Sequence, residues 1–304
     1  MSSDRRADLA LALTVLIWGA NFPIIKVALA PMPPFVVNAI RFTFSAIALG
    51  GVFWWQQRRS AVSFWEPLRA RWWTILGLAF LGYVVYQLGF IVGVDLTSAG
   101  SAALILASVP IWTAIISRVL GLERLAPAGW LGLLVSLGGT VLVITSGRAD
   151  FTGDTLEGNL LMLGAAVLWA LYTTLSRPVL DSGISASGLA FFGILVSLPA
   201  LYGLGFVALD GVEWAEVDLK VWGALLFSGA GSTGVAYWFW NVAVKQVGPS
   251  QASAWSNLVP VVALVSGLVL LGEPVTRFQV LGGALILAGL YILRRARKPV
   301  PIPT

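Results

Sequence analysis

Two phenols, an amide and a phenyl ring lie at helical spacing inside one long apolar stretch of the sequence, at Tyr83, Tyr86, Gln87 and Phe90. Their spacing of i, i+3, i+4 and i+7 places all four on a single helix face. A phenol or an amide that is buried on such a face needs a hydrogen-bonding partner, which a neighbouring helix, water or a ligand can supply. The face is therefore either a packing seam or one wall of a binding site.

Similar faces occur in other apolar stretches. Thr233, Tyr237 and Asn241 form one of them, and Trp169 and Tyr172 belong to another. Because polar groups inside apolar helices are costly unless they line water or pair with each other, we predict that these faces meet around a cavity. The cavity is expected to be rich in aromatic rings, amides and hydroxyls and to carry no fixed charge. The predicted substrate-binding residues are Asn21, Tyr83, Tyr86, Gln87, Ser108, Trp112, Trp169, Tyr172, Tyr237, Trp238, Asn241, Trp255 and Asn257.

Catalytic chemistry is poorly represented in this sequence. The chain has no histidine and no cysteine, which removes imidazole bases, thiolate nucleophiles, disulfides and the commonest zinc ligands. An intramembrane enzyme would also need a nucleophile with a base, or a metal–carboxylate group, inside an apolar stretch. Every aspartate and glutamate instead lies in a loop or near the end of such a stretch. We therefore expect no enzyme, no cofactor and no metal; a scaffold without transport activity stays open as an alternative.

The composition places the chain in a lipid bilayer. Hydrophobic residues make up 58% and charged residues 11% of its 304 residues, which is more apolar surface than a soluble core of this length can hide. The first apolar run is followed by many similar runs, so we expect no cleaved signal peptide. The basic residues lie in short loops beside apolar runs, where they report membrane topology, and no nucleic-acid partner is expected.

The elements that must carry the polar faces are membrane-spanning helices. A span needs about 20 mostly apolar residues to cross about 30 Å of hydrocarbon. We predict an all-α integral membrane protein with ten transmembrane helices, at 9–30, 34–55, 72–94, 98–117, 126–146, 158–178, 186–208, 219–244, 250–271 and 275–293. The bias of arginine and lysine to one side places the N- and C-termini in the cytoplasm. Lys26 and Arg41 lie below the opposite surface, where we expect them to extend to the headgroups; a watery cavity is the alternative.

The sequence also contains an internal repeat. Residues 119–132 read VLGLERLAPAGWLG and residues 269–282 read VLLGEPVTRFQVLG, and at the same offset Pro110 lies over Pro260. Ten spans divided into two copies give five spans per copy, and an odd number inserts the second copy upside down. We therefore predict two inverted five-helix repeats, at 9–146 and 158–295, with Pro110 and Pro260 as hinges of an alternating-access mechanism. A purely structural kink at each proline is the alternative.

These features resemble the EamA modules of the drug/metabolite transporter superfamily. The resemblance rests on a tryptophan early in each copy (LIWGANFP and VLWALYTT), a proline in the middle of each fourth span, and the GLERL and LGEPV turns. It covers almost the whole chain and is closest to the YddG-like aromatic amino acid exporters. It implies a basket of helices 1, 3, 4, 6, 8 and 9 around a central cavity, with helices 5 and 10 packed together on one side.

The expected function is export of small metabolites across the bacterial cytoplasmic (inner) membrane by a multi-pass transporter. Amino acids with aromatic or large apolar side chains suit the predicted cavity, and a nucleotide sugar, sugar phosphate or drug-like compound is the alternative. Proton coupling is not expected, because the centre is acid-free and Glu123 and Glu273 stand in helix turns, where capping or pairing with Arg124 or Arg277 is the simpler role. The expected partners are the substrate and the lipid bilayer, and the expected oligomeric state is a monomer.

Overall fold

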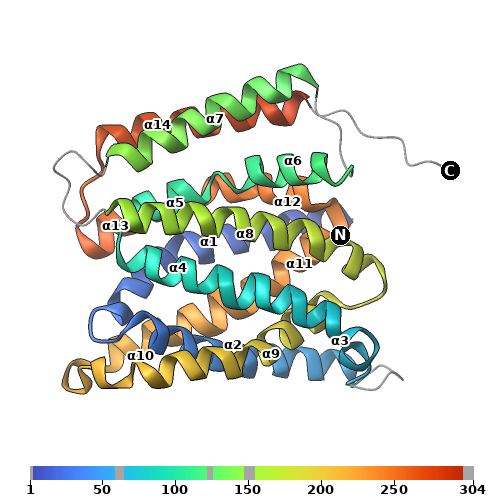
Figure 1. Cartoon of the computed structure of the whole chain (residues 1–304), viewed down its shortest axis with the longest axis vertical. Helices are drawn as coiled ribbons and strands as arrows, with labels where there is room; N and C mark the ends of the chain where they lie inside the picture. Colours follow the sequence, from blue (N-terminus) through green and yellow to red (C-terminus); the bar gives the residue numbers. More distant parts are fainter. Residues whose placement is uncertain (1–2, 59–64, 122–125, 147–154, 297–304) are drawn as a thin grey trace.

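The computed structural model of the chain describes residues 3–58, 65–121, 126–146 and 155–296. Every regular element in these ranges is a helix (Figure 1). The first half forms α1 (Ser3–Leu29), α2 (Pro34–Gln57), α3 (Glu66–Ala79), α4 (Tyr86–Asp95), α5 (Ala99–Leu106), α6 (Val109–Val119) and α7 (Pro127–Ser146). The second half forms α8 (Leu156–Asp181), α9 (Ala186–Val207), α10 (Leu219–Leu226), α11 (Ala236–Val247), α12 (Pro249–Trp255), α13 (Val259–Leu271) and α14 (Arg277–Ala296). Two π-helical segments, η1 (Phe80–Val85) and η4 (Phe227–Val235), and the short 3₁₀ segments η2 (Leu209–Gly211), η3 (Trp214–Glu216) and η5 (Ser256–Leu258) complete the described elements.

Six helical stretches are long and apolar enough, by length and composition, to cross a membrane. They are Ala7–Leu29, Pro34–Gln57, Arg71–Asp95, Ala99–Val119, Leu156–Asp181 and Ala186–Val207. Shorter apolar helices occupy Pro127–Gly139, Val259–Leu271 and Arg277–Gly289. Most residues of all ten predicted ranges are helical, so the expectation of an all-helical protein with several membrane-length apolar helices is confirmed.

Polar side chains fix where several helices begin. Ser98 precedes α5 and its hydroxyl accepts the Ser101 N–H at 3.2 Å, and Thr155 precedes α8 and accepts the Gly158 N–H at 2.9 Å. Each of these side chains pairs one of the N–H groups that the first turn of a helix leaves without a backbone partner. α5 and α8 therefore each begin at a residue whose side chain caps the helix.

The turn that the sequence repeats, once within residues 119–132 and once within 269–282, ends a helix each time. In the second copy it also caps another helix. Gly121 follows α6 with φ of 71° and Gly272 follows α13 with φ of 67°, a left-handed conformation that favours glycine at a helix end. The Glu273 carboxylate accepts the N–H of Ala99, the first residue of α5, at 3.1 and 3.3 Å. Of the two roles expected for Glu273, the described residues show capping, and the capped helix belongs to the other half of the chain. Glu123 and Arg124 lie outside the described residues.

The third and eighth predicted spans each contain a π-helical segment, and the fourth and ninth are each broken near a proline. The two π-helical segments end at Val85 and Val235, which occupy equivalent repeat positions. The fourth span breaks between α5 and α6, and the ninth at η5; Pro110 and Pro260 are the second residues of α6 and α13, directly after these breaks. Proline lacks an N–H and crowds the preceding turn, which accounts for helix breaks at these points.

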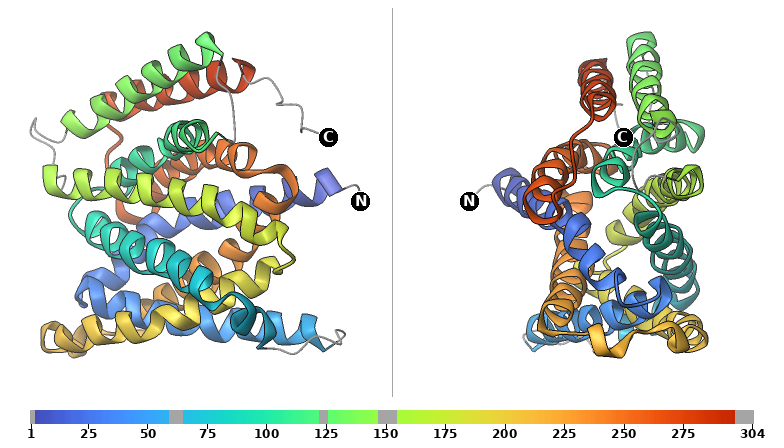
Figure 2. Two further views of the ribbon diagram at one scale, coloured as in Figure 1. Left: turned by 45° about the vertical axis from the view of Figure 1, so that its right-hand side comes forward. Right: turned by 90° about the vertical axis from the view of Figure 1, so that its left-hand side faces the viewer.

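α7 and α14 lie side by side along one edge of the molecule (Figures 1 and 2). A Cβ added to Gly139 would lie 2.6 Å from the Gly282 carbonyl oxygen, and one added to Gly289 would meet the Gly132 carbonyl oxygen. Small residues let helix backbones approach this closely in lipid. Because residues 132 and 282, like 139 and 289, are equivalent in the repeat, each helix makes the same contact with the other.

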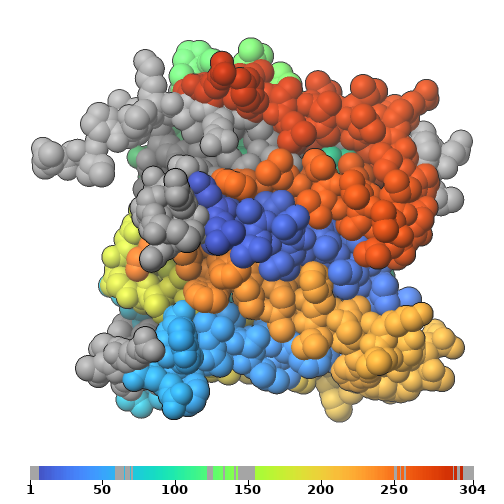
Figure 3. All heavy atoms as spheres, turned by 180° about the vertical axis from the view of Figure 1, so that it is seen from behind, coloured from blue at the N-terminus to red at the C-terminus, as the bar shows by residue number. Residues whose placement is uncertain are grey.

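The remaining helices pack around a common centre. α2 packs against α9 and η4 at the edge opposite to α7 and α14 (Figure 1). On the far face α1, drawn in blue, lies between α13 and the α10–α11 segment, so the first and last thirds of the chain are neighbours (Figure 3). Segments distant in sequence thus bring their polar faces to one interior region.

Candidate functional site

A cavity lies at this centre, with walls from both halves of the chain. Its aromatic lining consists of Trp18, Phe22, Tyr86, Phe90, Trp169 and Tyr237, and its polar lining of Asn21, Arg41, Gln87, Ser232 and Ser256. Ala103, Leu106, Ala107, Val109 and Val259 complete the wall. The cavity has a volume of about 50 Å³, which is room for a few waters. A ligand larger than a few waters therefore requires the lining side chains to move apart.

These lining residues come from the six helices that the resemblance implied and from one more. α1, α4, the α5–α6 segment, α8, the η4–α11 segment and the η5–α13 segment all contribute. Arg41 adds α2, which the implied basket did not include. The arrangement is therefore a cavity enclosed by helices of both halves, as expected, with one additional wall.

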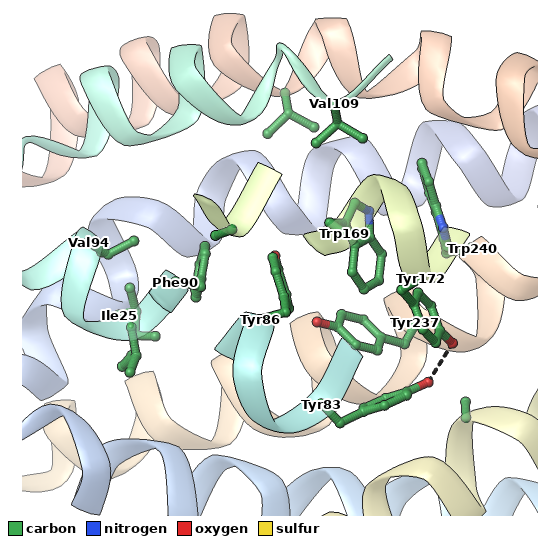
Figure 4. Close-up of a cluster of buried hydrophobic side chains, with 14 of the residues drawn as sticks. Ile25, Tyr83, Tyr86, Phe90, Val94, Val109, Trp169, Tyr172, Tyr237 and Trp240 are labelled. Atoms are coloured by element: carbon green, nitrogen blue, oxygen red, sulfur yellow. Dashed lines mark hydrogen bonds between the residues drawn. The ribbon is translucent and has the colours of Figure 1, made fainter. Parts of the chain in front are cut away.

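Trp169 lies at the centre of an aromatic cluster beside the cavity (Figure 4). Its ring centroid is 4.9 Å from that of Tyr237 and 5.0 Å from those of Tyr86 and Tyr172. The aromatic cluster comprises Trp18, Tyr83, Tyr86, Trp169, Tyr172, Tyr237 and Trp240. Ring pairs at these separations contribute about 0.5–1.5 kcal/mol beyond the burial of their area. The three faces singled out in the sequence therefore meet.

Hydrogen bonds join the polar ends of the cluster. The Tyr83 and Tyr172 hydroxyls are 2.7 Å apart (Figure 4), and Tyr172 donates to Asn241 Oδ1 at 3.2 Å. On the cavity side, Gln87 Nε2 donates to the Tyr237 hydroxyl at 2.5 Å. The Tyr83–Tyr172 and Gln87–Tyr237 bonds cross from η1 and α4 of the first half to α8 and α11 of the second, whereas the Tyr172–Asn241 bond joins α8 to α11 within the second half. The contacts tie the two halves together at the level of the cavity.

Five of the predicted substrate-binding residues line the cavity, and others lie behind its wall. The lining residues are Asn21, Tyr86, Gln87, Trp169 and Tyr237. Tyr83, Tyr172 and Asn241 are buried but do not line it. The Tyr83 ring packs against Tyr237 and the Tyr172 ring stacks on Trp169, while Asn241 bonds to Tyr172. Ser108 stands at the break before α6 and accepts the Trp112 indole N–H at 3.1 Å, so this pair stabilises the break.

The remaining predicted residues take other positions. Trp238 and Trp255 are partly buried against the core and do not line the cavity. Trp240 lies three residues after Tyr237 in α11, so it shares the inward face, and it is 1% exposed. Trp238 is adjacent to Tyr237 in sequence, so it is turned about 100° away from that face. The Asn257 side chain lies outside the described residues.

Arg41 corrects two expectations drawn from the sequence. It is 1% exposed and lines the cavity, so it does not extend to the headgroups, and the cavity has a fixed positive charge. NH1 donates to Asn38 Oδ1 at 3.0 Å and NH2 to Thr233 Oγ1 at 2.7 Å. The physical reason is packing, because the face of α2 that carries Arg41 is covered by η4, which also accepts a hydrogen bond from Ser45. Lys26 is only partly buried and does not line the cavity.

A sequence signal for Arg41 existed. Asn38, Arg41 and Ser45 are spaced i, i+3 and i+7, and all three are buried. This is the same spacing that identified the face beginning at Tyr83. A polar stripe that includes an arginine within an apolar helix is a functional-site candidate by default.

Comparisons with known proteins agree with this architecture. The model of the EamA-like transporter family matches residues 5–145 and again residues 156–295. The chain is 29% identical to an uncharacterized transporter of Bacillus subtilis, covering 90% of this chain and 88% of the relative. It is 26% identical to a probable amino-acid metabolite efflux pump of Salmonella typhimurium, covering 95% of each. A solved crystal structure with 22% sequence identity superimposes with a TM-score of 0.71 over 96% of this chain and 99% of the other, which supports the fold. The chain is a multi-pass membrane protein that belongs to the EamA-like transporter family.

Proposed function

We propose that this transporter exports small metabolites, above all amino acids with aromatic or large apolar side chains, across the bacterial inner membrane. The observation that carries the proposal is the cavity between the two halves, which combines aromatic rings with amide and hydroxyl groups. Such a lining accommodates an apolar side chain and hydrogen-bonds a polar end at the same time. The relative named as a probable amino-acid metabolite efflux pump supports the same substrate class. A YddG-like preference for aromatic amino acids is the narrower form of the proposal.

The two matched regions act as inverted repeats of five spans each, with both chain ends in the cytoplasm. Support comes from contacts between equivalent residues. Trp18 meets Trp169 with ring centroids 5.6 Å apart, and the contact of Gly139 with Gly282 has its counterpart in that of Gly289 with Gly132. Contacts of this reciprocal kind arise about a two-fold axis. Two such halves can exchange conformations, which opens the cavity to one side and then to the other.

The helix breaks are the places where this exchange bends the chain. The breaks before Pro110 and Pro260 lie in the fourth and ninth spans, beside Ala107, Val109 and Val259 of the cavity wall. One π-helical segment ends directly before Tyr86 and the other ends two residues before Tyr237. Local π-helix is frequent at functional sites. Bending at these points moves lining residues without unfolding a whole helix.

Transport proceeds without proton coupling in this proposal. Proton-coupled carriers hold an ionisable group inside the membrane, most often a carboxylate or histidine. The chain has no histidine, and none of the residues that line the described cavity is acidic. The protein would then act as a facilitator or exchanger that discharges surplus metabolite down its own gradient.

A carrier of sugar phosphates or nucleotide sugars is the second candidate. Arg41 is the observation that favours it, because a buried guanidinium suits a phosphate as well as a carboxylate. Arg41 is the single cation of the described lining, so it would balance only one of the two negative charges of a phosphate dianion. The amino acid is the better match, since its carboxylate carries one negative charge.

Counterflow in proteoliposomes tests the proposal. Vesicles loaded with unlabelled amino acid should take up the labelled amino acid with no pH difference and no potential, and phenylalanine or tryptophan should outpace glycine. An imposed pH gradient should not raise a neutral amino acid above equilibrium. Counterflow of a nucleotide sugar but of no amino acid in the same panel would favour the second candidate, and accumulation driven by pH would reveal a proton carrier.

A further inference from the structure

Among the described residues, Arg41 is held in the cavity wall by neutral partners alone. Asn38 Oδ1 and Thr233 Oγ1 accept hydrogen bonds from its two terminal nitrogens, and its guanidinium carbon lies 5.8 Å from the centroid of the Phe90 ring. None of the described lining residues is an aspartate or glutamate. A buried arginine without a counter-ion is costly, and a ligand that brings a negative charge offsets that cost.

Three polar atoms at the cavity wall have no hydrogen-bond partner among the described residues. They are one donor, Arg41 Nε, and two acceptors, Asn21 Oδ1 and Gln87 Oε1. Buried polar atoms without protein partners are rare and point to a bound water, an ion or a functional role. All three residues line the same cavity, so a single ligand can reach them once the lining side chains move apart.

The set matches the two charged ends of an α-amino acid. A carboxylate pairs with a guanidinium through short, charge-assisted hydrogen bonds. An ammonium group donates to amide oxygens and is attracted to aromatic faces, which Tyr86, Phe90 and Trp169 supply in this wall. A phosphate would satisfy Arg41 but would bring further oxygens toward the two amide oxygens, which need donors.

We propose that Arg41 binds the α-carboxylate of the substrate, and that Asn21 and Gln87 accept hydrogen bonds from its α-ammonium group. Resting on the proposed function, this assignment makes the zwitterionic backbone the feature that the transporter selects, while the aromatic wall accommodates the side chain. Removal of either charge from the substrate weakens its binding. Arg41 is then the specificity-determining residue for the carboxylate.

A purely structural role for Arg41 makes a different prediction. The residue also links α2 to η4 through Asn38 and Thr233, so its replacement could impair transport through packing alone. Packing damage lowers transport of every compound alike. Recognition of a carboxylate instead changes the ratio between a compound that has the carboxylate and one that lacks it.

The test is competition in phenylalanine counterflow by the full-length protein in proteoliposomes. The competitors are phenylalanine, phenylalaninamide, which lacks the carboxylate, and 3-phenylpropionate, which lacks the ammonium group. For the unmodified protein we expect each analogue to compete at least about 10-fold less well than phenylalanine, because each loses charge-assisted hydrogen bonds. Equal competition by phenylalaninamide would overturn the assignment of Arg41 and leave amino acid transport standing. Absence of counterflow with every amino acid would overturn the proposed function itself.

Variants locate the effect. Arg41→Gln should abolish the preference for phenylalanine over phenylalaninamide, and Asn21→Leu should reduce the preference over 3-phenylpropionate. Arg58→Gln is the matched control, since Arg58 follows the same helix, is exposed and contacts Trp54 instead of the cavity. A full preference retained by Arg41→Gln would contradict the assignment. If that variant cannot be extracted in folded form, the competition series on the unmodified protein decides the question.

Discussion

Gln87 and Tyr237 occupy equivalent positions in the two halves of the chain, 150 residues apart, and their side chains are joined by a hydrogen bond from Nε2 to the hydroxyl at 2.5 Å. In the inverted repeat that we propose, equivalent residues touch only where they lie close to the axis that relates the two halves. Both residues line the cavity. The place where substrate is proposed to bind is therefore the place where the two halves meet, so a change in either half alters the site.

The aromatic wall should contribute directly to substrate affinity. Trp169→Leu removes the ring that contacts Tyr86, Tyr172 and Tyr237. A ring contact with the substrate that is worth about 0.5–1.5 kcal/mol corresponds, when lost, to a rise of about 2- to 10-fold in the KM for aromatic amino acids. Counterflow kinetics measure this KM. Trp73→Leu, at a residue that is 69% exposed, serves as the control, and equal losses in both variants would mean that the cluster only packs.

The two prolines should affect the rate of transport more than the fold. Pro110→Ala and Pro260→Ala each allow a hydrogen bond that closes the helix break, which stiffens the segment that must bend. We expect counterflow to slow severalfold while the protein remains extractable and monodisperse. Pro199→Ala is the control, because Pro199 lies inside α9, away from the cavity. Unchanged flux in both cavity-side variants would remove the hinge role.

The close approach of α7 and α14 predicts opposite effects at two adjacent glycines. Alanine at Gly139 places a Cβ 2.6 Å from the Gly282 carbonyl oxygen, whereas at Gly138 it meets nothing within 4 Å. Gly139→Ala should lower the free energy of unfolding by about 1–3 kcal/mol through overpacking. Gly138→Ala should leave it unchanged or raise it by up to about 1 kcal/mol through helix propensity. Thermal unfolding in detergent compares them, and a stable Gly139→Ala protein would contradict the packing described for this pair.

Glu273 should stabilise the protein by capping a helix of the other half. Glu273→Ala removes the acceptor of the Ala99 N–H, and loss of a cap costs about 0.5–2 kcal/mol. Glu273→Gln retains an oxygen and should lose less. Glu216→Ala, in the exposed η3 segment, is the control in the same unfolding measurement. If Glu273→Ala unfolds at the same temperature as the unmodified chain, the cap contributes nothing.

The one-dimensional pattern of the sequence determined the class of this protein. Long apolar runs require a bilayer, and the helical spacing of Tyr83, Tyr86 and Gln87 places them on one helix face. Hydropathy and periodicity can both be read from the sequence because each depends only on residues that are close together along the chain. The repeat of Glu123 at Glu273 and of Pro110 at Pro260 indicated two related halves for the same reason. The absence of histidine and cysteine narrowed the possible chemistry, because a chain can use only the side chains that it carries.

The tertiary structure alone decided what each face meets. Arg41 lies below a membrane surface in sequence, and either lipid headgroups or a cavity could receive its side chain; the packing of α2 against η4 turns it inward to Asn38 and Thr233. Trp240, not Trp238, joins the aromatic cluster, because a helix buries the face that its neighbours cover. Glu273 caps α5 at Ala99, a residue 174 positions away. Each of these outcomes depends on contacts between segments distant in sequence, which periodicity along one segment does not encode.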